Sequence, residues 1–454
     1  MNSAGSSDVV MAPQPQTSAR HLLVVTYHFP PIQTPGVYRL IGLVKYLRAY
    51  GWRISVLTVK RSLYEVSVGT TVELIPQGVE VIRTHTTEAA AQLMRAAGTP
   101  APKSDEVRAP RKKSWLRRAL ALPGRPLLRA LSYPDYQVGW TPRVAREVIA
   151  FVKKHPGTVV LSSTPPHSSQ LGVRWARAFV RFGWVADFRD PWTAPARKPK
   201  GRGNLAAQRA MERWVLFGCD RIVANTPGNR EALLKAFPGL HQDRIRVITN
   251  AFDPTMVPPA DPGETPLACD MAYFGELYMG MLDAYLDALR ILVARDPATA
   301  PRLFVYGLVS AEDVARVRDY GLASHIVFHG TVSYAKSLSL MRSARSLLLL
   351  LPGGESLKTC VPSKLYTYLF TGHPVFALVP RGDAARVVEE AGAGEVVVPG
   401  DAEATAERLL SFVERVRRGE LTGSSPRAET TTRYSMERVA RDLNAVLEEV
   451  RARG

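Results

Sequence analysis

The chain alternates short apolar runs of strand length with amphipathic helical patterns, and it repeats this alternation twice. In the first half we expect strands over residues 22–27, 54–59, 79–84, 159–163, 184–188, 222–224 and 245–249. In the second half we expect them over residues 271–274, 303–306, 326–329, 346–351, 375–379 and 395–398. Strands that alternate with helices form parallel sheets covered on both faces. The sequence therefore predicts an α/β protein with two doubly wound, Rossmann-like domains that face each other across a cleft.

Proline-rich and polar stretches suggest where the domains begin and end. Residues 254–266 contain five prolines, which predicts a semi-rigid linker. The other expected units are a disordered leader over 1–20, an N-terminal domain over 21–253, a C-terminal domain over 267–424, and a C-terminal helix over 425–454 that crosses back to the N-terminal domain. The leader lacks the basic start and apolar core of a secretory signal. A long insertion, about residues 101–133, interrupts the N-terminal domain.

Positive charge is concentrated in the first half of the chain. The net charge is +18, of which residues 1–260 carry +21 and the remaining residues −3. Such an asymmetry indicates that the two halves meet different partners. No apolar run approaches the roughly 18 residues that cross a bilayer. The three cysteines, Cys219, Cys269 and Cys360, fit neither a disulfide framework nor a zinc site. These features favour a cytosolic protein.

A candidate phosphate site lies in residues 361–378. Pro362 precedes a short helix whose first turn contains Ser363 and Lys364, and Gly372 ends this helix before an apolar strand. A helix N-terminus presents unpaired backbone N–H groups and a partial positive charge. With a lysine in the first turn, this terminus suits a phosphate group.

The first strand leads into a matching turn. It ends near His28, and a turn with Gly36 follows before the next helix. A glycine at such a point lets the backbone approach a ligand, although it also serves simply to make the turn. The full dinucleotide fingerprint is absent, so we do not expect a nicotinamide or flavin cofactor. His28 is a candidate site residue, with capping of the turn as the alternative.

Polar side chains also follow two later strands of the first half. They are Ser163, Thr164 and His167 after one strand, and Arg189 and Asp190 after the next. Because parallel strands end at the same edge of a sheet, we expect all of them to gather beside His28.

Two interpretations of the acids in this second group stay open. Asp187 and Asp190 form either a general acid/base pair or, with Arg189, a salt-bridged loop. The sequence contains no D-x-D triplet and no histidine pair with metal-ligand spacing, so it predicts no catalytic metal. Asn250 and Asp253 end a further strand and are explained mainly by turn formation.

Five segments together resemble glycosyltransferases of the GT-B fold. The chain is similar to glycosyltransferase family 4, in the branch that assembles bacterial surface polysaccharides. The matching segments, in this order over about residues 20–450, are His28-Phe29-Pro30-Pro31 with Gly36-Val37-Tyr38-Arg39-Leu40, Thr164-Pro165-Pro166, Asp187-Phe188-Arg189-Asp190-Pro191-Trp192, Ile248-Thr249-Asn250-Ala251-Phe252-Asp253, and Pro362-Ser363-Lys364-Leu365-Tyr366-Thr367-Tyr368-Leu369 with Gly372-His373-Pro374.

The resemblance implies a role for each domain and for several residues. The C-terminal domain would hold a nucleotide-diphosphate sugar, a UDP-sugar rather than a GDP-sugar, and the N-terminal domain would receive a lipid-linked or saccharide acceptor. Ser363 and Lys364 match the helix that meets the donor phosphates. Gly36 matches the turn that approaches the sugar phosphate, and Gly275 matches the glycine after the first donor-domain strand. Thr367, also assigned to donor binding, stands where the family usually has a ribose-binding glutamate.

The remaining assignments concern the acceptor side and the chemistry. Candidate catalytic residues are His28, Arg189 and Asp190, and candidate acceptor-side residues are Tyr38, Thr164 and His167. The resemblance implies a retaining, metal-independent transfer without a cofactor. The family's cations after the Gly275 position are missing, so Lys364, with Lys358 or Arg39 as further candidates, would neutralise the diphosphate. Because of these departures, a catalytically silent GT-B scaffold that binds a nucleotide or glycan is the alternative.

The insertion contains an unusual basic segment. Residues 108–131 carry eight cations and no acid, interleaved with leucines and one tryptophan. Such a segment favours an anionic membrane, where each cation contributes about 1 kcal/mol. We expect contact through Arg111, Lys112, Lys113, Trp115, Arg117 and Arg118. The protein would then lie peripherally at the inner face of the cell membrane. A solvated loop is the alternative, and nucleic-acid binding is not expected because no recognition motif accompanies the charge.

Overall fold

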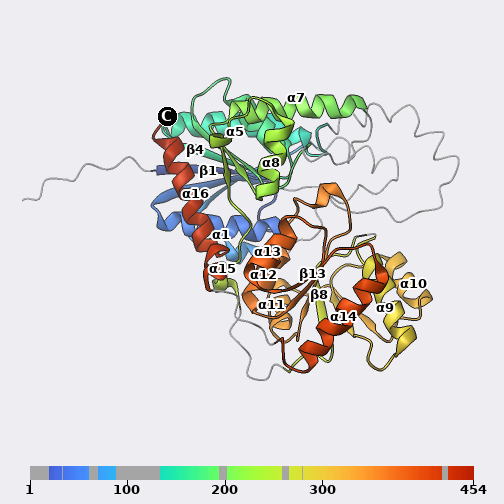
Figure 1. Cartoon of the computed structure of the whole chain (residues 1–454). Coiled ribbons are helices and arrows are strands. Elements are labelled where there is room, and N and C mark those ends of the chain that lie inside the picture. The colour runs from blue at the N-terminus through green and yellow to red at the C-terminus, as the bar shows by residue number, and fades with distance from the viewer. Residues whose placement is uncertain are drawn as a thin grey trace, which may run out of the picture.

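The computed structural model describes residues 20–32, 34–60, 70–87, 133–193, 202–257, 265–278, 280–421 and 428–453. These residues form two α/β lobes, one above the other in Figure 1, and each lobe is built on its own parallel sheet. Every strand expected from the sequence overlaps a strand of the structure. The prediction of two doubly wound domains is therefore confirmed.

The N-terminal lobe contains a seven-stranded sheet of order β3-β2-β1-β4-β5-β6-β7. Its strands are β1 (Arg20–Val25), β2 (Trp52–Val59), β3 (Glu80–Thr84), β4 (Val159–Thr164), β5 (Gly183–Phe188), β6 (Arg221–Ala224) and β7 (Ile245–Val247). Its helices are α1 (Pro35–Ala49), α5 (Thr141–Lys154), α6 (Ser168–Ala176), α7 (Arg202–Gly218) and α8 (Pro227–Ala236), with short 3-10 turns at Thr70–Leu74, Val138–Trp140, Gln242–Arg244 and Pro254–Met256.

The C-terminal lobe contains a six-stranded sheet of order β10-β9-β8-β11-β12-β13. Its strands are β8 (Met271–Phe274), β9 (Leu303–Tyr306), β10 (Ile326–Gly330), β11 (Leu347–Leu350), β12 (Val375–Leu378) and β13 (Gly394–Val397). Its helices are α9 (Asp283–Arg295), α10 (Ala311–Asp319), α11 (Tyr334–Arg342), α12 (Ser363–Thr371), α13 (Asp383–Ala391) and α14 (Ala402–Arg417), with a 3-10 turn at Glu355–Leu357.

Each sheet is buried on both faces, which explains why its strands read as continuous apolar runs. The central strand β4 is buried along its whole length, and so is β11, whose sequence is four leucines. Parallel strands need this double cover, because their crossover helices lie on both faces. In the described parts of the chain, no helix is long and apolar enough to cross a membrane.

The last two helices, α15 (Ala428–Arg433) and α16 (Met436–Arg451), return to the N-terminal lobe. The backbone amides of Phe252 and Met436 donate to the carbonyls of Tyr434 and Phe252, so the chain passes between the lobes twice, side by side. Helix α16 then crosses the N-terminal lobe, where it packs against α1 and β5 (Figure 1). The indole of Trp52 donates to Asn444 at 2.8 Å.

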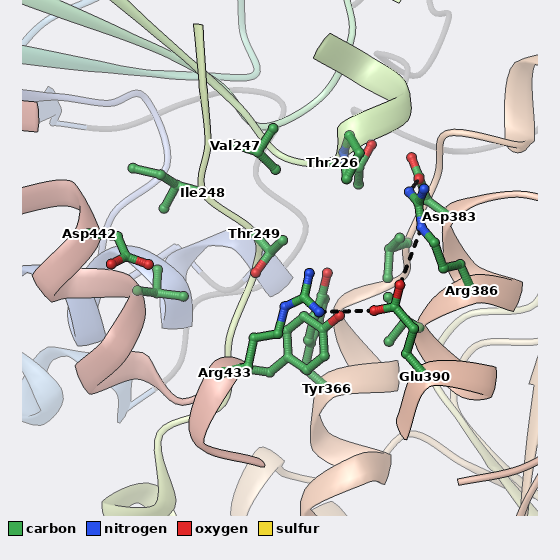
Figure 2. A pocket seen from close by; sticks show the side chains of 15 residues that line it. Thr226, Val247, Ile248, Thr249, Tyr366, Asp383, Arg386, Glu390, Arg433 and Asp442 are labelled. Carbon is green, nitrogen blue, oxygen red and sulfur yellow. Dashed lines mark hydrogen bonds and ion pairs between the residues drawn. The ribbon is translucent and has the colours of Figure 1, made fainter. Parts of the chain in front are cut away.

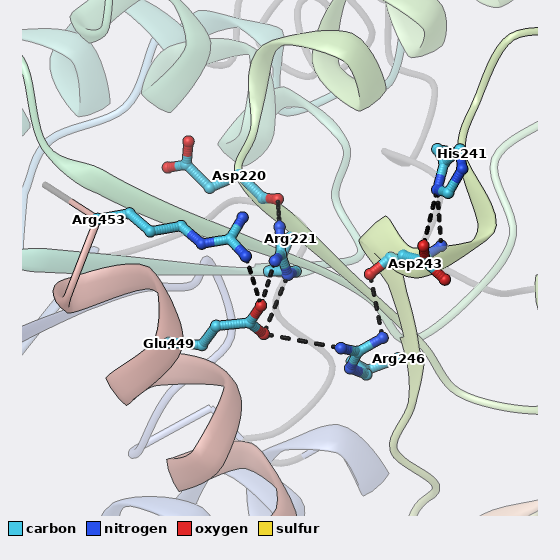
Figure 3. A network of polar contacts seen from close by, with 7 residues as sticks. All are labelled: Asp220, Arg221, His241, Asp243, Arg246, Glu449 and Arg453. Atoms are coloured by element: carbon cyan, nitrogen blue, oxygen red, sulfur yellow. Dashed lines mark hydrogen bonds and ion pairs between the residues drawn. The ribbon is translucent and has the colours of Figure 1, made fainter.

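An arginine cluster fixes the far end of α16. Glu449 accepts from Arg221 and Arg453 and lies 3.7 Å from Arg246 (Figure 3). The guanidinium of Arg221 is largely buried, so the pair is shielded from solvent more than an ordinary surface pair. The neighbouring arginines lower the pKa of Glu449, chiefly through the hydrogen bond from Arg221.

We predict that Leu443→Ala destabilises the whole protein. Leu443 is buried in the core that α16 shares with α1 and the sheet. Truncating a buried leucine costs about 2–5 kcal/mol, measured as the free energy of unfolding in urea. Arg441→Ala, an exposed neighbour on the same helix, should change it by less than about 0.5 kcal/mol. Equal effects of the two variants would show that α16 is not part of the cooperative core.

Candidate functional site

The order of strands creates one point of reversal in each sheet. The chain winds outward in opposite directions from β1 and β4 in one lobe, and from β8 and β11 in the other. In doubly wound sheets, ligands bind outside the carboxyl ends of the strands at such a point. His28 follows β1, Thr164 ends β4, Gly275 follows β8, and α12 comes after β11. The described candidate residues therefore lie at the two edges where this fold binds ligands.

Loops from these edges contact one another across the lobes. The hydroxyl of Thr226, after β6, donates to the carbonyl of Thr359 at 3.0 Å, and the amide of Gly228 donates to Asp383 at 3.0 Å. The rings of Tyr38 and Tyr334 stack with their centroids 3.9 Å apart. The carboxyl edges of the two sheets are thus close neighbours, as a ligand held between them requires.

Lys364 occupies an exceptional position at the start of α12. Its Nζ donates to the hydroxyl of Tyr273 at 2.6 Å and lies 3.8 Å from the centroid of that ring. No carboxylate of the described residues forms an ion pair with it. Burial lowers the pKa of Lys364 to about 7, against the opposing effect of Glu276. A half-buried ammonium without a paired acid gains strongly from an arriving anion.

The backbone of Gly275 passes directly beneath this lysine. Its φ of +117° is a conformation that other residues rarely adopt. A Cβ atom there would approach Nζ of Lys364 to 2.9 Å, so glycine leaves the lysine its place. Two candidates from distant parts of the sequence, Gly275 and Lys364, are therefore in direct contact.

On the opposite lobe, Gly36 and Arg189 make a similar close contact. The guanidinium of Arg189 lies so near Gly36 that any Cβ atom on residue 36 would collide with it. His28 lies nearby: burial, and then the charge of Arg189, lower its pKa to about 4. Its imidazole is therefore neutral at physiological pH, and its buried Nδ1 has no hydrogen-bond partner among the described residues. Asp190 is half-exposed, 3.9 Å from Arg189.

Asp187 is a structural residue, so its interpretation as half of an acid/base pair is wrong. Its carboxylate accepts from Arg39 at 2.6 Å and from the hydroxyl of Ser163 at 2.8 Å, and all three residues are buried. The salt-bridged loop is also wrong for Asp187, which pairs with Arg39 rather than Arg189. Because Arg39 is 4 % exposed and occupied by this pair, it is not available to neutralise a diphosphate.

The remaining donor-side candidates differ in how exposed their side chains are and in what they contact. Thr367 is only 8 % exposed, and its hydroxyl lies against that of Tyr334, whose ring also covers Tyr38. Tyr38, expected on the acceptor side, therefore contacts the C-terminal lobe. Ser363 is exposed in the first turn of α12, and Lys358 pairs with exposed Glu355.

The acceptor-side candidates differ from one another in orientation. The hydroxyl of Thr164 is buried and donates to the carbonyl of Asp187 at 3.2 Å, so it supports the sheet edge rather than facing a ligand. His167 stacks on Trp192 with centroids 4.4 Å apart and 4° between the planes. His167 thus orders the segment that follows Asp190.

Two buried acids that sequence reasoning missed hold this edge in place. Glu212 of α7 accepts from the amide and hydroxyl of Thr193, and burial raises its pKa to about 7. Asp135 accepts from the amide of Ser168 at 2.9 Å, and burial raises its pKa as well. Neither acid stands in a motif, and the sequence gives no signal that brings them to the site.

A cavity of about 220 Å³ lies between the lobes beside the C-terminal crossing (Figure 2). A chain of ion pairs, Asp383–Arg386–Glu390–Arg433, runs along one side of it. Its lining includes Thr226, Thr249, Tyr366 and Asp442 but none of the candidate donor or catalytic residues. The cavity is therefore separate from the candidate site.

No group of histidine, cysteine or acidic side chains in the described ranges is arranged to hold a metal ion. The residues expected to contact a membrane lie outside the described residues, so this contact stays a prediction. They are the basic residues Arg111, Lys112, Lys113, Arg117 and Arg118, and the aromatic residue Trp115.

Comparison with known proteins connects this geometry to glycosyltransferases. A D-inositol 3-phosphate glycosyltransferase of Rhodococcus opacus is 29% identical over 175 residues, which are 32% of this chain and 39% of that protein. The match thus spans about two fifths of that relative's length. No protein-family model matches the chain.

Solved structures match over nearly the whole chain. A sucrose-phosphate synthase from Thermosynechococcus elongatus superimposes with a TM-score of 0.62 at 14% identity, covering 96% of this chain and 100% of that one. An Anabaena protein in complex with UDP and glucose gives 0.60 at 15% identity, covering 94% and 99%. The predicted GT-B fold is therefore confirmed.

We predict that the Arg39–Asp187 pair stabilises the lobe without binding donor. Arg39→Met leaves Asp187 buried and unpaired, which should lower the free energy of unfolding by about 3–5 kcal/mol. The double variant Arg39→Met/Asp187→Leu should recover much of this loss, as measured by urea denaturation. A double variant as unstable as the sum of both singles would contradict a simple pair.

Proposed function

We propose that the protein is a glycosyltransferase that moves a sugar from a nucleotide-diphosphate sugar to a lipid-linked or saccharide acceptor in cell-surface polysaccharide synthesis. The observation on which this proposal depends is the position of Lys364. Its ammonium is half-buried beside Gly275 at the start of α12 and forms no ion pair with a carboxylate of the described residues. The shared fold and the partial relative among glycosyltransferases support the class of reaction. The similar structure that contains UDP and glucose supports a UDP-sugar as donor.

The mechanism that fits these residues depends on positioning and charge. The bond between the anomeric carbon and the diphosphate breaks while the acceptor oxygen bonds to the same carbon from the same face. The departing phosphate oxygen takes the acceptor's proton, so the protein supplies no general base. Lys364 and the free amides of α12 stabilise the negative charge that develops on the diphosphate. Configuration is retained, and no metal takes part.

The opposite lobe completes the site in this proposal. Arg189, pressed against Gly36, offers a second cation to the sugar phosphate from across the cleft. Neutral His28 donates or accepts a hydrogen bond without adding charge. Both groups are held by buried neighbours and need little rearrangement, which is what stabilises a transition state.

The proposal places the enzyme at the inner face of the cell membrane. A lipid-linked acceptor is confined to that surface, and the basic residues 108–131 provide eight cations to hold the protein there.

A silent GT-B scaffold in the same pathway is the second candidate. It is favoured by covered Thr367 in place of a ribose-binding acid. The two candidates differ in turnover: a scaffold with an intact phosphate site binds UDP but releases none from UDP-sugars supplied with lipid-linked acceptors.

We predict that Lys364→Met weakens UDP binding by about 10–100-fold, because a charge-assisted hydrogen bond to phosphate contributes about 1.5–3 kcal/mol. Isothermal calorimetry measures the change. Lys358→Met is the matched control, since that lysine is exposed and paired with Glu355. Equal affinity in wild type and Lys364→Met would overturn the donor site.

The same lysine sets the expected pH dependence. Its pKa is about 7 in the free protein, and a bound diphosphate raises it. Affinity should be steady below pH 7 and should fall by up to tenfold per unit as pH rises above it, because binding then requires uptake of a proton. Lys364→Met should remove this dependence, so the difference between the two profiles isolates the lysine.

We also predict that deleting residues 108–131 reduces binding to vesicles of phosphatidylglycerol and phosphatidylcholine. Eight cations leave the surface, so sedimentation with these vesicles should fall more than tenfold at low salt. Calorimetry with UDP serves as the control for folding. Undiminished sedimentation after the deletion would refute this role of the segment.

A further inference from the structure

The outer side of the N-terminal lobe carries a cluster of exposed aromatic rings. Trp175 lies on α6 and Phe179 in the turn after it, while Trp214 and Phe217 lie in the last turns of α7. Phe179 is 75 % exposed, and the other three are 38–46 % exposed. Several large rings exposed together on neighbouring elements commonly mark an interaction surface.

Arginine side chains join these rings into one surface. The guanidinium of Arg174 lies 4.5 Å from the centre of the Trp214 ring, and that of Arg213 lies 4.3 Å from the centre of Phe217. Arg174 also donates to the carbonyl of Trp214 at 3.2 Å, which ties the end of α6 to the end of α7. We call this surface, formed by Trp175, Phe179, Trp214, Phe217 and the adjacent arginines, the α6–α7 face.

The α6–α7 face carries an excess of positive charge. Its arginines are Arg174, Arg177, Arg181, Arg209 and Arg213. The only acid in residues 168–182 and 202–218 is Glu212, which is buried and bonded to Thr193. Arg177 pairs with Asp220, and Arg209 lies close enough to buried Glu212 to lower its pKa. No ion pair joins Arg174, Arg181 or Arg213 to an acid of the described residues. A second copy of the same face would meet like charge, so self-association through it is disfavoured.

We propose that the α6–α7 face docks on an anionic membrane surface. Tryptophan and phenylalanine rings settle at the boundary between headgroups and acyl chains, and arginines bind lipid phosphates just above it. This inference rests on the proposed function, which places the acceptor on a lipid. It assigns membrane contact to residues other than 108–131.

The position of the face is compatible with transfer. Helix α7 runs along the side of the N-terminal lobe that points away from the C-terminal lobe (Figure 1). Both helices run back from the carboxyl edge of the sheet, so the rings lie at the helix ends remote from His28 and Arg189. Docking through them leaves the interlobe edges uncovered.

The test uses the full chain and vesicles of phosphatidylglycerol mixed with phosphatidylcholine. Replacing all four rings by serine should lower the partition coefficient, measured by sedimentation, by at least about tenfold. Phe179→Ser alone should lower it several-fold, and this variant removes no described contact. Arg181→Gln/Arg209→Gln should lower it by about fivefold per charge, and only while phosphatidylglycerol is present.

Tyr320→Ser provides the matched control. Tyr320 is an exposed ring in the C-terminal lobe with Arg290 5.3 Å from its centre, so it has the same chemistry in another place. This variant should bind vesicles like wild type. Melting temperatures and UDP calorimetry verify that every variant is folded.

The outcomes separate this inference from the proposed function. If all ring variants bind vesicles like wild type, the membrane assignment of the face is overturned, and loss of function in cells alone would then indicate a protein partner. Transfer to a water-soluble acceptor should be unchanged in these variants. Absence of transfer to any acceptor, with vesicle binding still dependent on the rings, would remove the proposed function and leave the docking face.

Discussion

The site depends on one constraint, which is that parallel strands all leave their sheet at the same edge. Each βα turn therefore delivers its side chains to a shared rim, however far apart the residues are in sequence. Reversal of strand order between β1 and β4, and between β8 and β11, opens that rim at a single place in each lobe. The double crossing at Phe252 and Met436 then holds the two rims close together. Sheets facing in any other direction would keep Lys364 and Arg189 from the single ligand that the proposed function assigns to both.

Lys364 shows how a desolvated side chain at this sheet edge can contribute to the binding of an anion. Burial disfavours the charged form of this ammonium more than Glu276 favours it, and the lowered pKa expresses this cost. Arg39 has the opposite arrangement, since its guanidinium forms a buried ion pair with Asp187 and also donates to the carbonyl of Ile248. Both are cations near the facing sheet edges, yet the proposed function gives the diphosphate to Lys364, because no carboxylate of the described residues forms an ion pair with it. Pairing, rather than proximity, distinguishes a binding cation from a structural one.

The sequence could predict which residues reach the sheet edges, but not how their side chains pair there. The positions of strands and helices could be predicted from apolar runs bounded by glycine, proline and polar residues. These runs are clear because both faces of each sheet are buried. The proximity of His28, Gly36 and Arg189 could also be predicted, because each of them follows the carboxyl end of a strand in the same parallel sheet. The pairing of Asp187 with Arg39 could not be foreseen, since it depends on how α1 packs over β5. Nor could the roles of Glu212 and Asp135, which contact loops far away in sequence, or the cover that Tyr334 places over Thr367.

The unequal charge of the two halves of the chain fits the separate partners that the proposed function gives to the two lobes. A protein that binds both an anionic membrane and an anionic donor cannot rely on uniform positive charge. In a uniformly basic molecule, the donor-binding face would also be attracted to the lipid and would be covered by it. Here the excess of +21 lies in residues 1–260, and the rest of the chain carries −3. Under the proposed membrane contact, long-range attraction orients the N-terminal lobe toward the lipid. The proposed donor site instead relies on short-range groups, a helix terminus and one desolvated lysine, which in this proposal act only once the diphosphate has entered.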